Sequence, residues 1–323
     1  MLLLAVAFLA LGCSGGDHGS DAVGELVVAR DDGVYALDLE SGEEREIGPV
    51  EKYGGVWSSS GTKAASGDGL TTVVTDVPSG SSERFATPQC YPHAWSPDQT
   101  MLACLYTDPW TVSTFDPDTG EVRTLTDASD HSYGPAWSPD SRSIAYVGPD
   151  GITVMNRDGS GKHRVAVGYA DQHLGGPAWS PDGRRIAFPS DEGVSIVNAE
   201  GGEPSVLLET GGRATYGLTW SPDGRYVAVT HGDGGDYELF VIDVDGREAQ
   251  NVTDNERIHD RGAVWSPDSR HVAYYSDGED GRAVMVVPVG GGEPSRVLDL
   301  GDGPGRASDL ASILHWSTAT QVD

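Results

Sequence analysis

The sequence predicts an all-β protein, a seven-bladed β-propeller built from four-stranded antiparallel blades. Three observations support this prediction. Trp-Ser-Pro-Asp occurs five times, successive copies of the motif tryptophan lie 38 to 51 residues apart, and the intervening segments contain short alternating runs with no helical period. The intact copies begin at Trp95, Trp137, Trp179, Trp220 and Trp265, and degenerate copies begin at Trp57 and Trp316.

The unit that begins at Trp179 illustrates how local rules give four strands. In Ser180-Pro181-Asp182-Gly183, proline supplies the φ that the second position of a type I turn needs, and glycine suits the residue that closes a hairpin. Residues 185–188 and 194–197 alternate in polarity, and Gly201-Gly202 turns the chain into a fourth short strand at 206–208. The same frame fits residues 142–148 with 151–156, 225–231 with 239–246, and 271–278 with 285–292.

The two ends of the repeat region predict how the ring closes. Residues 24–30, 32–42 and 44–48 read as the last three strands of a blade that lacks its first strand. Residues 308–317 carry the missing strand and its tryptophan, so the two ends are expected to share one sheet and leave no open edge. Six or eight blades remain alternatives if Trp57 or Trp316 does not mark a blade.

A large aromatic residue at one fixed position in each repeat indicates a filler between blades. Tryptophan contributes a large apolar area, and its N–H can reach a backbone carbonyl. We therefore interpret the tryptophan series as core rather than as a binding surface.

The N-terminal segment resembles a bacterial lipoprotein signal. Residues 1–12 are apolar and too short to span a bilayer, and they end before Cys13. We expect a signal peptide at 1–12, a lipidated Cys13 and flexible tether over 13–24, the propeller over 25–317 and a tail at 318–323. This organisation places the protein in the bacterial cell envelope, anchored by lipid to the periplasmic or extracellular face of a membrane.

Two further cysteines, Cys90 and Cys104, flank the hairpin at Trp95. Strands on either side of a hairpin pair antiparallel, so a cross-strand disulfide is one alternative in an oxidising compartment. Two unpaired buried thiols are the interpretation that we favour from the sequence.

The charge balance limits the partners. The chain has 21 Lys and Arg against 50 Asp and Glu, a net charge of −29. Nucleic acids and anionic lipid surfaces attract the opposite charge and are excluded as partners. A monomer that binds a protein, a small molecule or a glycan, with membrane contact only through the lipid anchor, is expected.

Motifs for catalysis and cofactors are absent from the sequence: it has no P-loop, His-Glu-x-x-His, Cys-x-x-Cys or dinucleotide fingerprint. One constellation remains, because three histidines each lie six residues before a motif tryptophan with a carboxylate nearby. The candidate ligand-binding residues are His131, His173, His259, Asp130, Asp171 and Asp260. They are expected in loops on the face opposite the Trp-Ser-Pro-Asp hairpins, spread around the channel mouth. No cofactor and no catalytic residue is predicted, and a divalent cation is the one cofactor alternative.

The Trp-Ser-Pro-Asp series, the Gly or Ser that follows it and the Ile-Ala-Phe-like strand resemble the TolB-type propeller repeat over about residues 25–317. The resemblance implies a non-catalytic scaffold that binds a protein or another ligand. The sequence also resembles oligogalacturonate lyase, a stand-alone propeller that uses a divalent metal. That likeness implies the alternative function, a metal-assisted lyase or hydrolase that acts on an acidic glycan at the channel mouth.

Overall fold

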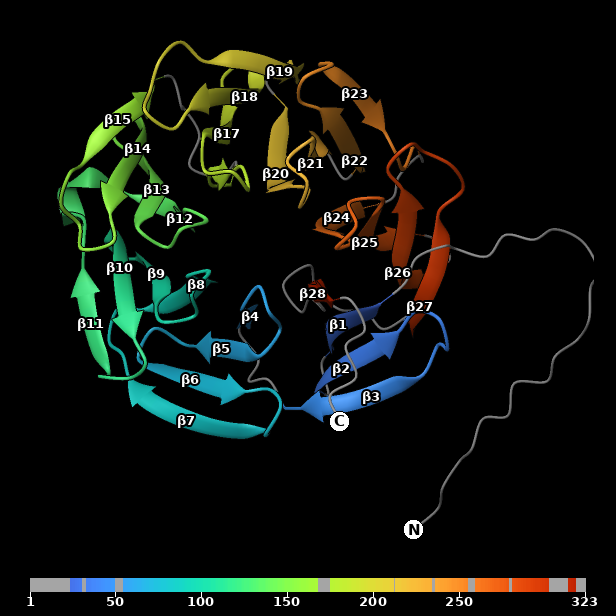
Figure 1. The fold of residues 1–323 in the computed structure, drawn as a ribbon, viewed down its shortest axis with the longest axis horizontal. Coiled ribbons are helices and arrows are strands. Elements are labelled where there is room, and N and C mark those ends of the chain that lie inside the picture. Colours follow the sequence, from blue (N-terminus) through green and yellow to red (C-terminus); the bar gives the residue numbers. More distant parts are fainter. Residues whose placement is uncertain are drawn as a thin grey trace, which may run out of the picture.

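The computed structural model describes residues 24–30, 33–49, 55–167, 175–211, 213–233, 236–254, 259–278, 281–301 and 313–317. Its strands form seven four-stranded blades arranged in a ring around a central axis (Figure 1). Five blades are separate sheets. The other two are joined into one eight-stranded sheet by a single parallel bridge between Tyr237 and His259. The predicted seven-bladed β-propeller is therefore confirmed.

The blades are numbered here by the order in which the chain enters their second strands. Blade 1 consists of β28 (Ile313–Ser317), β1 (Glu25–Arg30), β2 (Gly33–Asp38) and β3 (Glu44–Gly48). Blade 2 consists of β4 (Val56–Trp57), β5 (Lys63–Gly67), β6 (Thr71–Asp76) and β7 (Ser81–Ala86). Blade 3 consists of β8 (Tyr91–Trp95), β9 (Leu102–Thr107), β10 (Trp110–Asp116) and β11 (Glu121–Thr124).

The remaining blades follow the same order from the inner to the outer strand. Blade 4 consists of β12 (Tyr133–Trp137), β13 (Ser143–Gly148), β14 (Gly151–Asn156) and β15 (His163–Ala166), preceded by the short 3-10 helix η1 (Ala128–Asp130). Blade 5 consists of β16 (Ala178–Trp179), β17 (Arg185–Ser190), β18 (Gly193–Asn198) and β19 (Ser205–Glu209). Blade 6 consists of β20 (Ala214–Trp220), β21 (Tyr226–Asp233), β22 (Asp236–Asp243) and β23 (Glu248–Asn251). Blade 7 consists of β24 (His259–Trp265), β25 (His271–Gly278), β26 (Gly281–Pro288) and β27 (Ser295–Gly301).

Blade 1 is the predicted composite of the two chain ends. Its inner strand β28 pairs antiparallel with β1, and Trp316 lies opposite Leu26. This register repeats that of blade 5, where Trp179 lies opposite Ile186. The prediction that the ends are joined within one sheet is confirmed.

The hairpin after each motif tryptophan is held by its own side chains. In blade 5 the Ser180 hydroxyl donates to the Asp182 carboxylate at 2.6 Å, and the amide of Arg184 donates to the same carboxylate oxygen at 3.0 Å. Gly183 closes the turn with φ +70° and donates its N–H to the carbonyl of Ser180. The turn chemistry inferred from Ser-Pro-Asp-Gly is therefore present.

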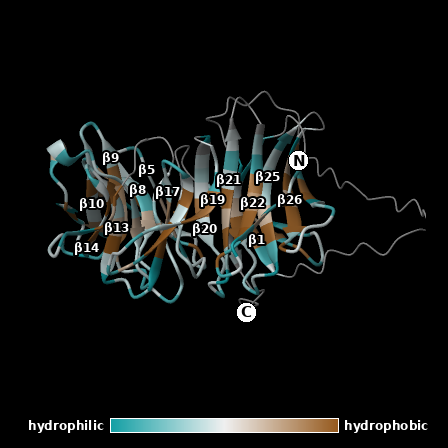
Figure 2. Ribbon diagram, turned by 90° about the horizontal axis from the view of Figure 1, so that it is seen from above, coloured by the Kyte–Doolittle hydropathy of each residue, from teal (hydrophilic) through white to brown (hydrophobic). Residues whose placement is uncertain are grey.

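The hydrophobic core lies between the blades, at mid-height in the ring (Figure 2). Six clusters of buried residues each join two neighbouring blades. Among the described residues, six motif tryptophans belong to these clusters or pack against them, whereas Trp57 does not. Five of the six are 4% to 7% exposed: Trp95, Trp137, Trp220, Trp265 and Trp316. Their core role is confirmed.

Cys90 and Cys104 form a disulfide, which corrects the interpretation that they are unpaired thiols. Cys90 directly precedes β8 and Cys104 lies in β9, and their Cα atoms are 4.9 Å apart, within the range that a disulfide spans. Both are fully buried. The sequence alone could not decide, because hydrophobic burial and cross-strand pairing both place cysteine there.

The predicted signal peptide and nearly all of the predicted tether, residues 1–23, lie outside the described residues, as does the tail at 318–323. Within the described part of the chain, no helix has the length and apolar character needed to cross a membrane.

Candidate functional site

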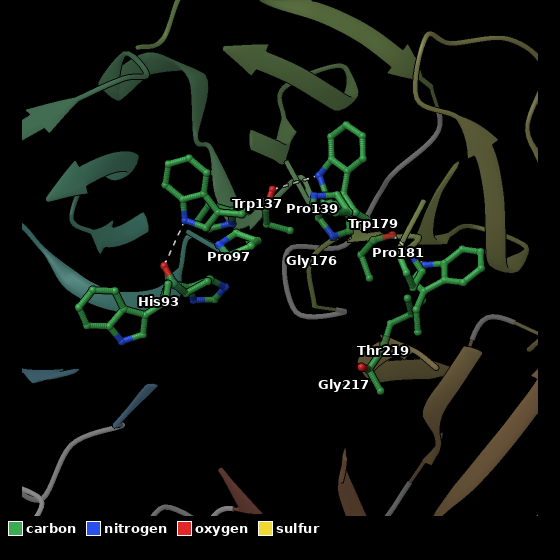
Figure 3. Close-up of a pocket in the computed structure, with 18 residues that line it drawn as sticks. His93, Pro97, Trp137, Pro139, Gly176, Trp179, Pro181, Gly217 and Thr219 are labelled. Carbon is green, nitrogen blue, oxygen red and sulfur yellow. Dashed lines mark hydrogen bonds between the residues drawn. The ribbon is translucent and has the colours of Figure 1, made fainter. Parts of the chain in front are cut away.

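The inner strands of blades 3 to 6 line a cavity of about 600 Å³ at the centre of the ring (Figure 3). Each of these blades contributes its motif tryptophan and the two residues before it. Blades 3, 4 and 5 add the proline of the following hairpin, namely Pro97, Pro139 and Pro181. The cavity is therefore lined by proline rings, by the His93 side chain and by inner-strand backbone, whereas the indoles of Trp95, Trp137 and Trp220 are buried between the blades.

Glycine lets the inner strands approach one another around the cavity. Gly134 has φ +61° at an irregularity in the pairing of β12 with β13. A Cβ atom at Gly134 would lie 2.7 Å from the Cα atom of Gly176 in blade 5, so a larger residue would force the two blades apart. Gly217 has the same conformation in blade 6, with φ +62°. These positions leave peptide groups facing the cavity.

Among the described residues that line the cavity, His93 is the one that titrates. It lies two residues before Trp95, and blades 4, 5 and 6 carry Pro135, Pro177 and Leu218 at the equivalent position. Its side chain is exposed, and the space that it faces is the cavity between the blades. Desolvation by these walls lowers the pKa of the His93 imidazole, so the neutral ring is favoured.

The sequence analysis concentrated on histidines six residues before the tryptophan and missed His93. A signal was available, because positions close to the tryptophan on the innermost strand must face the channel or the neighbouring blade. A neutral imidazole there can donate one hydrogen bond and accept another.

His131 and Asp130 lie where the chain enters blade 4. His131 adopts a left-handed conformation with φ 45° at the end of η1 and is exposed. Its Nδ1 lies 3.2 Å from the carbonyl oxygen of Ser129, a local contact within the loop. Asp130 is half-buried. Burial of the Tyr146 hydroxyl raises the pKa of Tyr146 to about 12, and the negative charge of Asp130 contributes to the increase.

His259 and Asp260 are neighbours in β24 but differ sharply in environment. The ring of half-buried His259 lies against Tyr237 of blade 6, with 5.4 Å between centroids. Asp260 is completely buried. Burial raises the pKa of Tyr274, and the charges of Asp260 and Glu238 raise it further. These two residues therefore belong to the interface of blades 6 and 7.

The structure does not gather the predicted histidines into one site. His131 is in blade 4 and His259 in blade 7, with blades 5 and 6 between them on one side of the ring (Figure 1). His173 and Asp171 lie outside the described residues. Among the residues that are described, no group of three His, Cys, Asp or Glu side chains is arranged to hold a metal ion.

Comparisons with known proteins agree with this architecture. Residues 152–308 match the family model described as the TolB beta propeller domain. No curated protein matches the sequence.

Three solved structures resemble the fold. A TolB-type protein from Agrobacterium tumefaciens is 17% identical with a TM-score of 0.53, over 86% of this chain and 89% of that chain. The oligogalacturonate lyase from Vibrio parahaemolyticus is 18% identical with a TM-score of 0.60, over 79% of this chain and 82% of that chain. The β-propeller domain of the Trilobed protease from Pyrococcus furiosus is 16% identical with a TM-score of 0.62, over 87% of this chain and 97% of that chain. At these identities the likeness shows the fold alone.

Proposed function

Because the chain is a TolB-like β-propeller, we propose that it is a non-catalytic scaffold of the cell envelope that binds a segment of a protein in its central channel. The observation that carries this proposal is the cavity of about 600 Å³ walled by four blades. Its volume lies within the range of ligand-binding pockets. Peptide groups at its surface can pair with an extended segment, and the proline rings can pack against its side chains.

The character of the cavity favours this function over cleavage of an acidic glycan. The described lining residues include no Lys or Arg that would pair with uronate carboxylates. The net charge of −29 also produces a field that repels a polyanion. A neutral or basic protein segment meets neither obstacle.

Two features support an extracytoplasmic location. The buried Cys90–Cys104 disulfide is of a kind that persists in oxidising compartments and is rare in the cytosol. The apolar residues 1–12 and Cys13 resemble an export signal with a lipidation site. We propose that lipid on Cys13 tethers the ring, as a monomer, to a membrane of the envelope.

The channel can be tested by placing a photo-crosslinking amino acid at position 93 in living cells. The matched control carries the same amino acid at Glu40, which is exposed in the turn between β2 and β3. The expected result is an adduct of defined mass from position 93 that is missing from position 40. Absence of any adduct from position 93, or the same adducts from both positions, would contradict binding in the channel.

The tether can be tested by metabolic labelling with a fatty acid. The wild-type protein is expected to take up label and to sediment with membranes, whereas Cys13→Ser should be unlabelled and soluble with an unchanged melting temperature. Unlabelled wild-type protein in a bacterial host would refute the lipid anchor while leaving channel binding intact.

A further inference from the structure

The interface between blades 1 and 2 differs from the other six. Each of those six interfaces contains a cluster of buried hydrophobic residues contributed by both blades. Within the described ranges, no such cluster joins blade 1 to blade 2. The difference has a cause in the sequence of blade 2.

The clearest difference is at the residue of the second strand that pairs with the motif tryptophan. Blade 2 has Ala64 there, opposite Trp57. The other six blades have larger aliphatic residues at this position: Leu26, Leu102, Ile144, Ile186, Val227 and Val272. Blade 2 therefore presents less side-chain volume to its neighbour.

Two neighbouring positions of blade 2 also carry smaller or more polar residues than most of the other blades. Two residues after Ala64 lies Ser66, where the blades that follow have Cys104, Tyr146, Phe188, Val229 and Tyr274. On the third strand, Ala64 pairs with Thr75. The equivalent residues of the other blades are Leu37, Phe115, Met155, Val197, Ile242 and Val287.

A cavity of about 330 Å³ occupies the space left by these small residues. Its described lining comes from strands β5, β6 and β7, where Ala64, Ser66 and Thr75 contribute, and from Pro49 and Gly55 in the connection from blade 1 to blade 2. Ala64 and Ser66 are buried, whereas Ser82 and Glu83 of the outer strand β7 line the cavity and are exposed. The cavity therefore runs from the blade interface to solvent, and a ligand can enter past the outer strand.

The tryptophan of this interface also has an unused donor. Trp57 Nε1 is buried and has no hydrogen-bond partner among the described residues. The five intact-motif tryptophans all donate to a carbonyl oxygen of the preceding blade. Among the described residues, blades 1 and 2 are thus less completely joined than their neighbours, in packing and in hydrogen bonding.

We propose that the pocket between blades 1 and 2 binds a single aromatic ring, of the size of phenol. Three other blades fill the position of Ser66 with a ring of their own, from Tyr146, Phe188 or Tyr274, so a ligand ring would restore the packing that those blades contain. A cavity of about 150 Å³ lined by apolar side chains is already sufficient to bind benzene. The hydroxyl groups of Ser66 and Thr75 add polar partners, which favours a phenol over a hydrocarbon.

The ring can come from a free small molecule or from a tyrosine side chain of a bound peptide. This site lies outside the channel and does not depend on the proposed channel function. Phenol and N-acetyl-tyrosinamide are the probes that distinguish the two sources, because the second carries peptide groups that must fit past the outer strand.

The experiment measures binding of each probe to the full chain by calorimetry and by the shift in melting temperature. Wild-type protein is expected to bind phenol with a millimolar or lower Kd. Ser66→Phe places in blade 2 the residue that blade 5 has, and is expected to weaken binding at least tenfold while raising the melting temperature. Ser66→Ala, the matched control, keeps the volume and should retain binding within about threefold.

The second variant Ala64→Val fills the same space with less bulk and serves if Ser66→Phe does not fold. Binding of phenol alone would assign the site to a small molecule, and binding of both probes would assign it to a tyrosine side chain. No binding of either probe to wild-type protein, or equal binding to wild type and a folded Ser66→Phe, would overturn the proposal. Crosslinking at position 93 reports separately on the channel.

Discussion

The indole Nε1 of Trp220 donates a 3.0 Å hydrogen bond to the carbonyl oxygen of Ala178, the residue that precedes Trp179 in the neighbouring blade. The same relation links Trp179 to Ala136 and Trp137 to Ala94, each time from one blade to the one before it. The tryptophan therefore fills the interface with its ring and fixes the relative height of two blades with its N–H.

Replacing Trp220 by Ala should lower the free energy of unfolding by about 3–5 kcal/mol, because it leaves a cavity between blades 5 and 6. Trp220→Phe keeps an aromatic ring and removes the donor, so its cost should be nearer ~1 kcal/mol plus a packing loss. Trp57→Phe is the matched control, since Trp57 has no acceptor among the described residues. Equilibrium denaturation measures all three variants. A Trp57→Phe loss as large as that of Trp220→Phe would show that the indole hydrogen bond adds nothing.

Reducing the Cys90–Cys104 disulfide should destabilise the ring. The bond closes a loop with a sequence separation of 14 residues, for which the chain-entropy model gives about 3 kcal/mol. The double variant Cys90→Ser, Cys104→Ser should unfold at a lower denaturant concentration than oxidised wild type, and a reductant should shift only the wild type. Two titratable thiols in protein purified from an oxidising compartment would contradict the disulfide.

Deleting residues 309–323 removes β28 and leaves β1 of blade 1 with an unpaired edge. Exposed edges of this kind promote aggregation, so the truncated chain should lose its cooperative thermal transition and elute as larger species in gel filtration. Deleting only 318–323 keeps β28 and should preserve the wild-type transition. Unaltered melting of the longer deletion would refute closure through β28.

Acid should weaken the Trp-Ser-Pro-Asp hairpins. The Ser180 hydroxyl and the amide of Arg184 hold the pKa of the Asp182 carboxyl below its usual range. A folded-state pKa below the unfolded value of about 3.9 gives stability that is present above that pH and lost as the pH falls through the folded-state pKa. Carboxyl carbon chemical shifts should give a pKa for Asp182 below the unfolded value of about 3.9. Ser180→Ala should raise the Asp182 value toward normal, and an unchanged value would show that the hydroxyl is not the cause.

The sequence predicted the fold because the hairpin turns and the spacing of the strands are specified locally and repeated in each blade. Ser180 to Gly183 specify a turn by their own chemistry, and the spacing between Trp179 and Trp220 specifies a blade. Closure of the ring was also predictable. The strand that carries Trp316 repeats the pattern of the other inner strands, and it pairs with β1 so that Trp316 lies opposite Leu26.

The candidate site was less predictable because it depends on the relation between blades. The histidine positions repeat in sequence, yet His131 and His259 lie in blades that are not neighbours. His93 occurs once and so gave no periodic signal, although it faces the cavity. Ala64 and Ser66 can be recognised as unusually small only when they are compared with the equivalent residues of the other blades, and this comparison requires the strand register.

The direction of the indole hydrogen bonds has a consequence for how such rings change size. In the five intact-motif blades, the donor is a side chain and the acceptor is a backbone carbonyl, which every residue possesses. A blade copied whole would bring its own donor to the blade before it and offer its own acceptor to the blade after it. Duplication of an intact-motif blade therefore preserves this hydrogen bond at both new interfaces, so that only the side-chain packing between blades restricts a change in the size of the ring.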